Sequence, residues 1–215
     1  MRKYYLCHTL KPTIMRTFTI LANEYLDRNI QAYYHTDYVG HNNPGNPDYL
    51  NTLKNTFGNF TSERLNNACH ELETVLMQDI PQIFESLHCE SLTVCVIPRA
   101  KAEYQTNQLL FKSTVKNVIN RLGENYCDGT NYIKRYRDTK TTHLRNLEGN
   151  EGATPYPGIT FDTCTISDNV KDKDILLIDD IYTKTINIDE DAIQALIESG
   201  AKSVTFYAVG RTRSH

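Results

Sequence analysis

The sequence predicts an α/β protein built on a parallel sheet with helices on its faces. Four short segments have the length and composition of strands, at residues 92–97, 159–166, 175–178 and 204–209. Segments with apolar residues three and four positions apart, as in amphipathic helices, separate several of them. Strands that alternate with helices form parallel sheets with right-handed crossover connections, so we expect this architecture here.

Three helices are expected to cover the sheet. The first begins at Ser62, which we expect to cap it, and restarts at Pro81, because proline fits the first turn of a helix. The second spans residues 103–122 and the third residues 188–199, and a glycine follows each of these two, as is typical of helix ends. The polar, basic and turn-rich residues 130–158 predict a long loop or a loose hairpin.

The N-terminal part of the chain is harder to assign, because Tyr, Asn and Thr are frequent and apolar periodicity is weak. We expect a short helix near residues 17–28 and a strand near residues 30–36. The Pro, Gly and Asn residues clustered at 41–47 are typical of a surface loop. We divide the chain into an N-terminal hood or helical extension (1–90), an α/β core (91–212) and a possible tag remnant (213–215).

Length, charge and cysteine pattern limit the class of protein. The chain has 215 residues, enough for one α/β domain with an elaborated end. Its net charge of −3 offers no broad basic field, so a nucleic acid partner is not indicated. Six scattered cysteines form no CxxC pair, so we predict reduced thiols and no zinc site. We find no signal peptide and no apolar span of roughly 20 residues, and we expect a cytoplasmic protein that does not bind membranes.

The strand at residues 175–178 runs directly into two acids, Asp179 and Asp180, and a polar turn follows. Ligands of open parallel sheets bind at the carboxyl ends of strands, so this junction is the leading candidate for a binding site. Adjacent carboxylates accept hydrogen bonds from the vicinal hydroxyls of a ribose, or hold Mg²⁺ directly or through water. Alternatively, one acid caps the turn and the other is solvated.

The turn after the acids carries hydroxyl, amide and ammonium groups that suit a phosphate monoester, from Thr183, Lys184, Thr185 and Asn187. Backbone N–H groups at the start of the following helix favour the same ligand. The alternative is ordinary capping of this helix by Thr185 or Asn187. The acids at 189–191 suit the helix dipole but oppose a phosphate one turn away.

Four apolar residues, two acids and a Thr-rich turn together resemble the phosphoribosyl pyrophosphate (PRPP) signature of type I phosphoribosyltransferases. The resemblance implies the Rossmann-like fold of that family with an N-terminal hood. It also implies a Mg²⁺ cofactor, held indirectly by Asp179 and Asp180 through water, while the same acids bind the PRPP ribose. The chain departs from the signature at Thr185, where the family has glycine, and at Asn187, where it has threonine. Glycine lets a backbone approach a phosphate closely.

A second segment carries the same resemblance. Residues 98–101 follow the strand at 92–97, where family members have a short diphosphate-binding loop, and Arg99 and Lys101 supply suitable charge. Further segments near residues 107, 135–139 and 208–212 resemble the branch related to competence protein F and to amidophosphoribosyltransferases. The resemblance implies catalytic roles for Asp179, Asp180, Arg99 and Lys101. The substrate-binding residues that it implies are Pro98, Arg99, Ala100, Lys101, Asp179, Asp180, Ile181, Tyr182, Thr183, Lys184, Thr185 and Asn187.

A basic segment occupies the place of the family's mobile catalytic loop, with Arg135, Arg137, Lys140 and His143 as its candidate residues. Such a loop closes over the diphosphate and excludes water. The alternative is a solvated segment with no role in binding.

The function implied by the resemblance is transfer of phosphoribose from PRPP to a nucleobase or amine, with release of diphosphate. Tyr182 is a candidate for stacking against a flat acceptor, and the acceptor itself is not indicated. One rival is a non-catalytic module that senses PRPP or a nucleotide and regulates a protein partner in DNA uptake or phage defence. Another is a hydrolase or phosphotransferase with Asp179 as nucleophile. A homodimer is the default assembly.

Overall fold

The computed structural model describes residues 15–40, 43–54, 59–140 and 162–213. Its strands are β1 (Arg16–Ile20), β2 (Ile30–Tyr38), β3 (Leu92–Val96), β4 (Tyr126–Asp128), β5 (Ile133–Arg135), β6 (Cys164–Ile166), β7 (Asp174–Tyr182) and β8 (Ser203–Thr212). Its helices are α1 (Asp48–Lys54), α2 (Ser62–Leu87), α3 (Leu110–Leu122) and α4 (Ile188–Glu198), with short 3-10 turns η1 (Thr106–Gln108) and η3 (Asp168–Val170).

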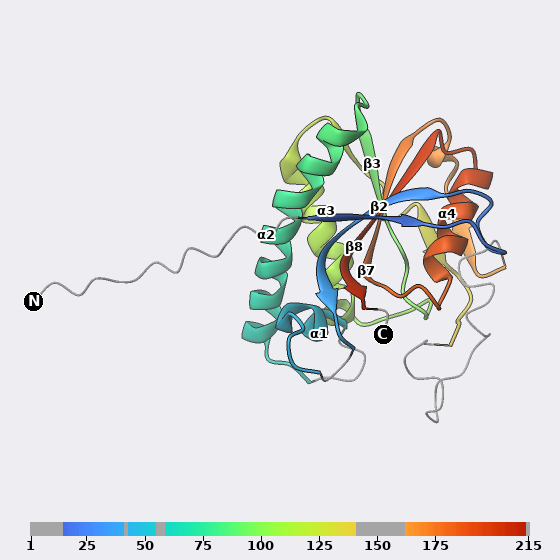
Figure 1. Ribbon diagram of the computed structural model, residues 1–215. Helices are drawn as coiled ribbons and strands as arrows, with labels where there is room; N and C mark the ends of the chain where they lie inside the picture. The colour runs from blue at the N-terminus through green and yellow to red at the C-terminus, as the bar shows by residue number, and fades with distance from the viewer. Residues whose placement is uncertain (1–14, 41–42, 55–58, 141–161, 214–215) are drawn as a thin grey trace, which may run out of the picture.

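A six-stranded sheet in the order β1-β2-β8-β7-β3-β4 divides the molecule into two layers. The five strands from β2 to β4 are parallel, and β1 pairs antiparallel with β2 at the edge. Helices α1, α2 and α3 cover one face and α4 covers the other (Figure 1). The predicted α/β class and mostly parallel sheet are therefore confirmed, and the arrangement is compatible with a Rossmann-like fold. No helix in the described part of the chain has the length and apolar character needed to cross a membrane.

Strand β7 contributes side chains to both cores, as a buried central strand should. Leu176 and Ile178 pack with α1, α2 and α3, whereas Ile175 and Leu177 pack on the side of α4. Ile178 and Ile181 both belong to the first core, so the two-residue alternation is interrupted at the acid pair between them. From this point on, the side chains of β7 do not all pack in the core.

The predicted helix near residues 17–28 is wrong, because residues 16–20 form strand β1. Alternation explains the difference: Thr17 and Thr19 are β-branched, and Phe18 between them packs its ring against Tyr34 and Tyr182, with centroids 5.7 and 5.0 Å apart. The expected strand near residues 30–36 is present as β2. It lies beside β8, so the N-terminal part of the chain supplies two strands of the main sheet.

Helix α2 is continuous through Pro81, where the sequence predicted a restart. Leu76, Ile80 and Ile83 are fully buried on either side of the proline, and their packing holds the helix together across it. Its cap is Thr61, one residue before the predicted Ser62: the Thr61 hydroxyl accepts a hydrogen bond from the backbone N–H of Arg64 at 3.3 Å.

Replacing Thr61 by alanine is expected to lower the free energy of unfolding by about 1 kcal/mol, because one N–H group of the first helical turn loses its partner. Urea denaturation followed by circular dichroism measures this change. Thr61→Ser keeps the hydroxyl and is the control; equal stability of the Ala and Ser variants would contradict the capping role.

The second predicted helix begins later than expected, since η1 precedes α3, which starts at Leu110 rather than at residue 103. Strand β5 lies in the predicted loop at 130–158 and pairs antiparallel with β6, so that Arg135 lies opposite Cys164. β6 is the described part of the strand predicted at 159–166, and it belongs to this separate two-stranded sheet instead of the expected parallel one. Residues 141–161 lie outside the described part of the chain.

A buried polar cluster joins α2 to the sheet. Asp79 is fully buried, and its Oδ2 lies 2.8 Å from Nδ1 of His35 on β2. The hydroxyl of Tyr207 on β8 donates to the same oxygen at 2.8 Å. Because buried polar groups are costly without partners, these bonds fix the position of α2 over β2 and β8.

Candidate functional site

The acid pair and the loop after β3 leave the sheet at the same edge. Val96 pairs with Ile178, and the backbone N–H of Ile97 donates to the Ile178 carbonyl at 3.0 Å. Residues 98–101 therefore begin beside Asp179 and Asp180. Strand β7 was predicted to end at residue 178, but it continues through the acids to Tyr182 because its pairing with β8 extends that far.

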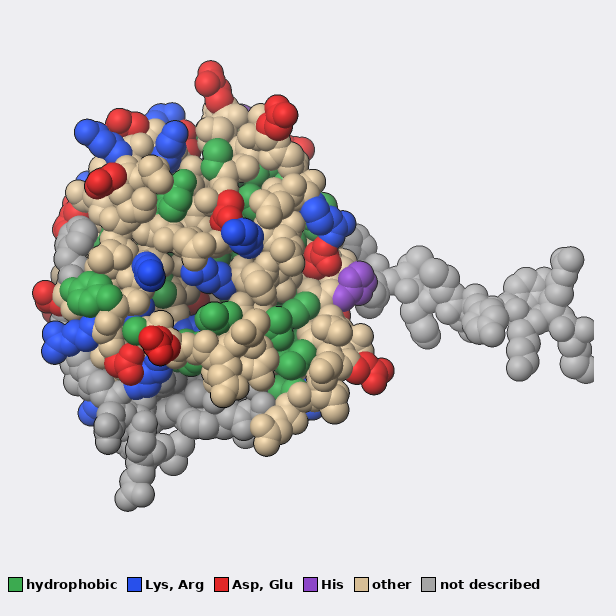
Figure 2. Space-filling view, turned by 180° about the vertical axis from the view of Figure 1, so that it is seen from behind, with side chains coloured by type: hydrophobic (Ala, Val, Ile, Leu, Met, Phe, Trp, Pro, Cys, Tyr) green, Lys and Arg blue, Asp and Glu red, His purple; other side chains and the backbone are tan. Residues whose placement is uncertain are grey.

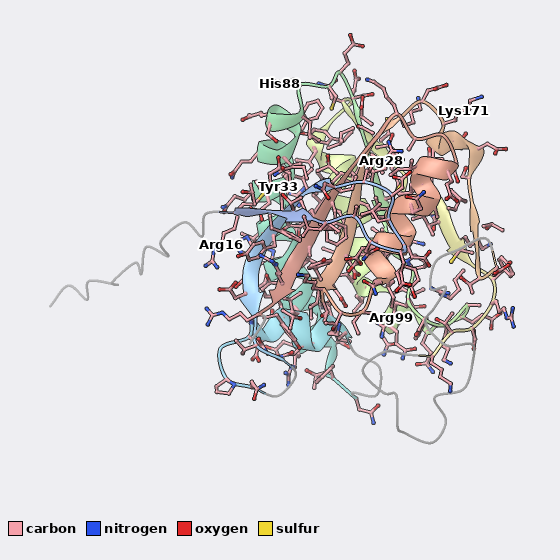
Figure 3. All side chains as sticks on the ribbon, turned by 45° about the vertical axis from the view of Figure 1, so that its right-hand side comes forward. Arg16, Arg28, Tyr33, His88, Arg99 and Lys171 are labelled. Atoms are coloured by element: carbon pink, nitrogen blue, oxygen red, sulfur yellow. The ribbon has the colours of Figure 1, made fainter. Side chains whose placement is uncertain are left out.

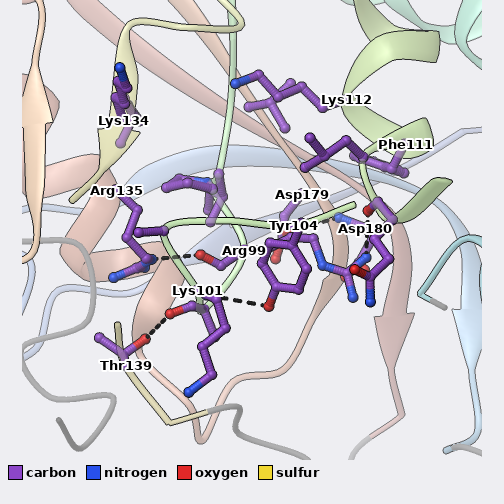
Figure 4. A pocket seen from close by; sticks show the side chains of 18 of the residues that line it. Arg99, Lys101, Tyr104, Phe111, Lys112, Lys134, Arg135, Thr139, Asp179 and Asp180 are labelled. Carbon is purple, nitrogen blue, oxygen red and sulfur yellow. Dashed lines mark hydrogen bonds between the residues drawn. The ribbon is translucent and has the colours of Figure 1, made fainter. Parts of the chain in front are cut away.

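One cavity of about 420 Å³ lies at this edge and brings together the two predicted segments (Figure 4). Asp179 and Asp180 contribute its carboxylates. Apolar side chains that include Leu53, Phe111 and Ile188 complete part of its wall. Its lining also contains seven cationic side chains, from Lys54, Arg99, Lys101, Lys112, Lys134, Arg135 and Lys140. Such an excess of positive charge suits a ligand with several negative charges.

The two carboxylates point to different partners. Asp180 lies toward α1, where the Lys54 ammonium is 3.1 Å from Oδ1 and 3.3 Å from Oδ2. Asp179 accepts a hydrogen bond from the backbone N–H of Asp180 at 2.8 Å and a second one from the side chain of Asp189 on α4. The acid pair is thus held from both faces of the sheet.

Asp179 and Asp189 form a buried carboxyl pair. Burial raises the pKa of Asp179 to about 7, and the neighbouring charge of Asp180 adds to this rise while the Lys54 ammonium opposes it. Asp189 is only 3 % exposed, and burial together with the charge of Asp179 raises its pKa well above the ordinary value. At least one proton therefore stays on this pair at neutral pH.

Three contacts hold the Arg99 side chain near the start of the loop at residues 98–101. Its guanidinium donates to the carbonyl of Gln108 at 2.8 Å and to the carbonyl of Lys54 at 2.6 Å. It also stacks over the ring of Tyr104, 4.6 Å from the centroid. In Figure 3, Arg99 lies at the end of the molecule opposite Lys171. These contacts preorganise a cation next to Asp180.

The rest of the loop is tied to the basic segment. Arg135, buried in β5, donates from Nε to the carbonyl of Arg99 at 2.6 Å. The carbonyl of Ala100 accepts from the backbone N–H of Thr139 at 2.8 Å, and the Lys101 ammonium lies 3.9 Å from Asp138. The structure thus brings Arg135 and Lys140 to the cavity, whereas Arg137 is exposed and does not line it. His143 lies outside the described residues.

The turn at residues 183–187 does not line the cavity, and two of its side chains contact other segments of the protein. Ile188, directly after the turn, does line the cavity. The hydroxyls of Thr183 and Thr212 lie 2.8 Å apart. Asn187 adopts a left-handed conformation with φ 59° at the start of α4, and its side-chain oxygen accepts from Asn23 at 3.2 Å. Asn187 precedes α4 but its side chain makes no capping bond.

Tyr182 and the acids that open α4 face inward. Tyr182 is 4 % exposed, and its hydroxyl donates to Glu190 at 2.8 Å. Its ring packs against Phe18 and Phe206, so protein covers the surface that a flat acceptor needs for stacking. Asp189, Glu190 and Asp191 are all buried, although three acids in a first helical turn are typical of an exposed helix start.

Two residues that contact the acid pair directly were not found from the sequence. Lys54 lies in a short helix far from the motifs, and no local pattern pointed to it. Asp189 was noted only for its effect on a phosphate. The turn between β7 and α4 brings Asp189 close to Asp179, and no sequence pattern indicates this contact.

On the face seen in Figure 2, Lys and Arg side chains are interspersed with Asp and Glu side chains. Comparison with known proteins assigns no family to the chain, because no protein-family model and no curated protein sequence matches it.

Proposed function

We propose that this protein binds PRPP and transfers its phosphoribosyl group to a nucleobase or amine with release of diphosphate. One observation carries the proposal: the acid pair after β7 and the Arg99–Lys101 loop after β3 share a single cavity with an excess of cations. A sugar with a diphosphate on one carbon needs this combination, because hydroxyls pair with carboxylates and phosphates with cations.

In this proposal different side chains bind the ribose, the diphosphate and the 5-phosphate. Asp179 and Asp180 accept hydrogen bonds from the ribose hydroxyls and orient C1. Arg99 and Lys101 bind the diphosphate and stabilise the charge that grows on it as the C1–oxygen bond breaks, while the acceptor nitrogen forms the new bond to C1. Residues 183–187, which follow the acid pair beyond the cavity lining, receive the 5-phosphate at the start of α4.

Mg²⁺ fits the carboxylate pair best as an ion shared with the phosphates of the substrate. Among the described residues no group of three or more His, Cys, Asp or Glu side chains is placed to hold a metal. Mg²⁺ is often bound by one or two carboxylates together with substrate phosphates, so Asp179 and Asp180 would hold it, directly or through water, beside a bound diphosphate. When bound there, it neutralises part of the diphosphate charge.

The proposal also includes the fold family of the core and the role of the N-terminal residues. A sheet that places an acid pair and a basic loop at neighbouring strand ends supports a type I phosphoribosyltransferase fold for residues 91–212. Lys54 and Leu53 of α1 line the cavity from outside this core. This position supports a role for α1 as the part of residues 1–90 that closes the site, while β1 and β2 belong to the main sheet.

The second candidate, a sensor that binds PRPP or a nucleotide without turning it over, is favoured by the turn at 183–187. Its Thr183 and Asn187 side chains already have partners within the protein, and residue 185 carries a side chain where the signature has glycine. A phosphate would bind there less tightly than in a turn whose donors are unoccupied.

The two candidates differ in one measurement. We expect the protein, incubated with Mg²⁺, PRPP and a panel of nucleobases and amines, to release diphosphate, detected by ³¹P NMR. Arg99→Met is expected to lower the rate at least tenfold, because the leaving group loses a charge-assisted contact. Binding of PRPP by calorimetry without diphosphate release would support the sensor, and absence of binding would contradict both.

A further inference from the structure

Lys54 connects the two halves of the cavity. It is the last residue of α1, and its ammonium is within 3.3 Å of both oxygens of Asp180. Its backbone carbonyl accepts a 2.6 Å hydrogen bond from Arg99. One residue from the N-terminal segment thus contacts both the acid pair and the main cation of the diphosphate loop.

The pair formed by Lys54 and Asp180 stands where a divalent cation would bind. Both side chains are partly exposed to the cavity, at 25 % and 29 %. A metal ion that binds the Asp180 carboxylate is repelled by the neighbouring ammonium, because two cations held close together repel each other. Movement of the ammonium away from the carboxylate relieves this repulsion. The displaced ammonium stays within the cavity, where a phosphate group of the proposed ligand would lie.

We propose that Lys54 is an exchangeable counter-ion of this site. Without ligand its ammonium holds Asp180 in place and balances the charge of the acid pair. When a divalent cation binds, Lys54 gives up the carboxylate and contributes its charge to a phosphate group of the ligand. The second half of this proposal deepens the proposed function and rests on it, whereas the first half concerns the chain alone.

Lys54→Met tests the exchange, because methionine keeps the length of the side chain and removes the charge. Mn²⁺, titrated without any sugar phosphate and followed by electron paramagnetic resonance, is expected to bind the variant at least tenfold more tightly than the wild type. Inorganic diphosphate without metal, measured by calorimetry, is expected to bind the variant at least fivefold more weakly, and Lys54→Arg to restore that affinity.

Lys171→Met is the matched control, since Lys171 is exposed and lies at the other end of the molecule from Arg99 (Figure 3). Circular dichroism establishes that each variant is folded. Mn²⁺ affinities of the Lys54→Met and wild-type proteins within twofold of each other, or no Mn²⁺ binding by either, would overturn the exchange. Unchanged diphosphate affinity would overturn the role in phosphate binding. If the wild type fails to bind PRPP, the proposed function fails, while the Mn²⁺ comparison still decides the first half.

Discussion

Replacing Asp179 and Asp180 together by asparagine is expected to abolish binding of PRPP in the presence of Mg²⁺. Hydrogen bonds to charged groups contribute about 1.5–3 kcal/mol each, so loss of both carboxylates lowers the affinity by roughly 100-fold or more. Asparagine has the same shape, and the substitution also removes the charge of a half-buried carboxyl pair, so the fold is expected to remain intact. Calorimetry with Mg²⁺ and PRPP measures the loss.

The matched control is Asp174→Asn, because Asp174 begins the same strand at the opposite end of the sheet. Its carboxylate contacts Lys202 at 2.7 Å and Ser203 at 2.6 Å, away from the cavity. This variant is expected to bind PRPP as the wild type does. Undiminished affinity in the double variant, or an equal loss in the control, would refute the assignment of the acid pair.

The sequence predicted those parts of the fold that local patterns determine. The apolar runs at 92–97, 175–178 and 204–209 correspond to β3, β7 and β8, because strands buried on both faces must be apolar along their whole length. The parallel arrangement followed from the helices between them. Placement of the acids and of the loop at 98–101 at one edge followed in turn, since parallel strands end on the same side.

Features that depend on distant partners escaped prediction. Residues 16–20 form a strand because β2 is beside them, and a single edge strand has little signature of its own. Lys54 belongs to the site because α1 packs in the same core as β7. The sequence linked the acids at 189–191 only to the helix dipole and to a nearby phosphate, and it gave no sign that they are buried. Their burial depends on Tyr182 and Asp179, which reach them only in the folded chain.

The carboxyl pair of Asp179 and Asp189 predicts an unusual dependence of stability on pH. A carboxyl group whose pKa is higher in the folded than in the unfolded protein binds its proton more tightly when folded, so its contribution to stability is lost as the pH rises. For Asp179 this loss extends from about pH 4 to about pH 7, and Asp189 extends it further. Ion-paired acids such as Asp174, with a lowered pKa, act oppositely, but their effect is complete above about pH 4.

Replacing Asp189 by asparagine is therefore expected to stabilise the protein at pH 8 by about 1–3 kcal/mol, because the amide still donates to Asp179 without a buried charge of its own. At pH 5 the difference is expected to be smaller by at least about 1 kcal/mol, because each pH unit between the ordinary pKa of the carboxyl group and its raised value in the folded protein costs about 1.4 kcal/mol. Urea denaturation at both pH values measures this, with exposed Asp168→Asn as the control. A wild type whose free energy of unfolding rises between pH 5 and pH 8, or an Asp189→Asn variant that is less stable at pH 8, would show that the two carboxyl groups do not share a proton.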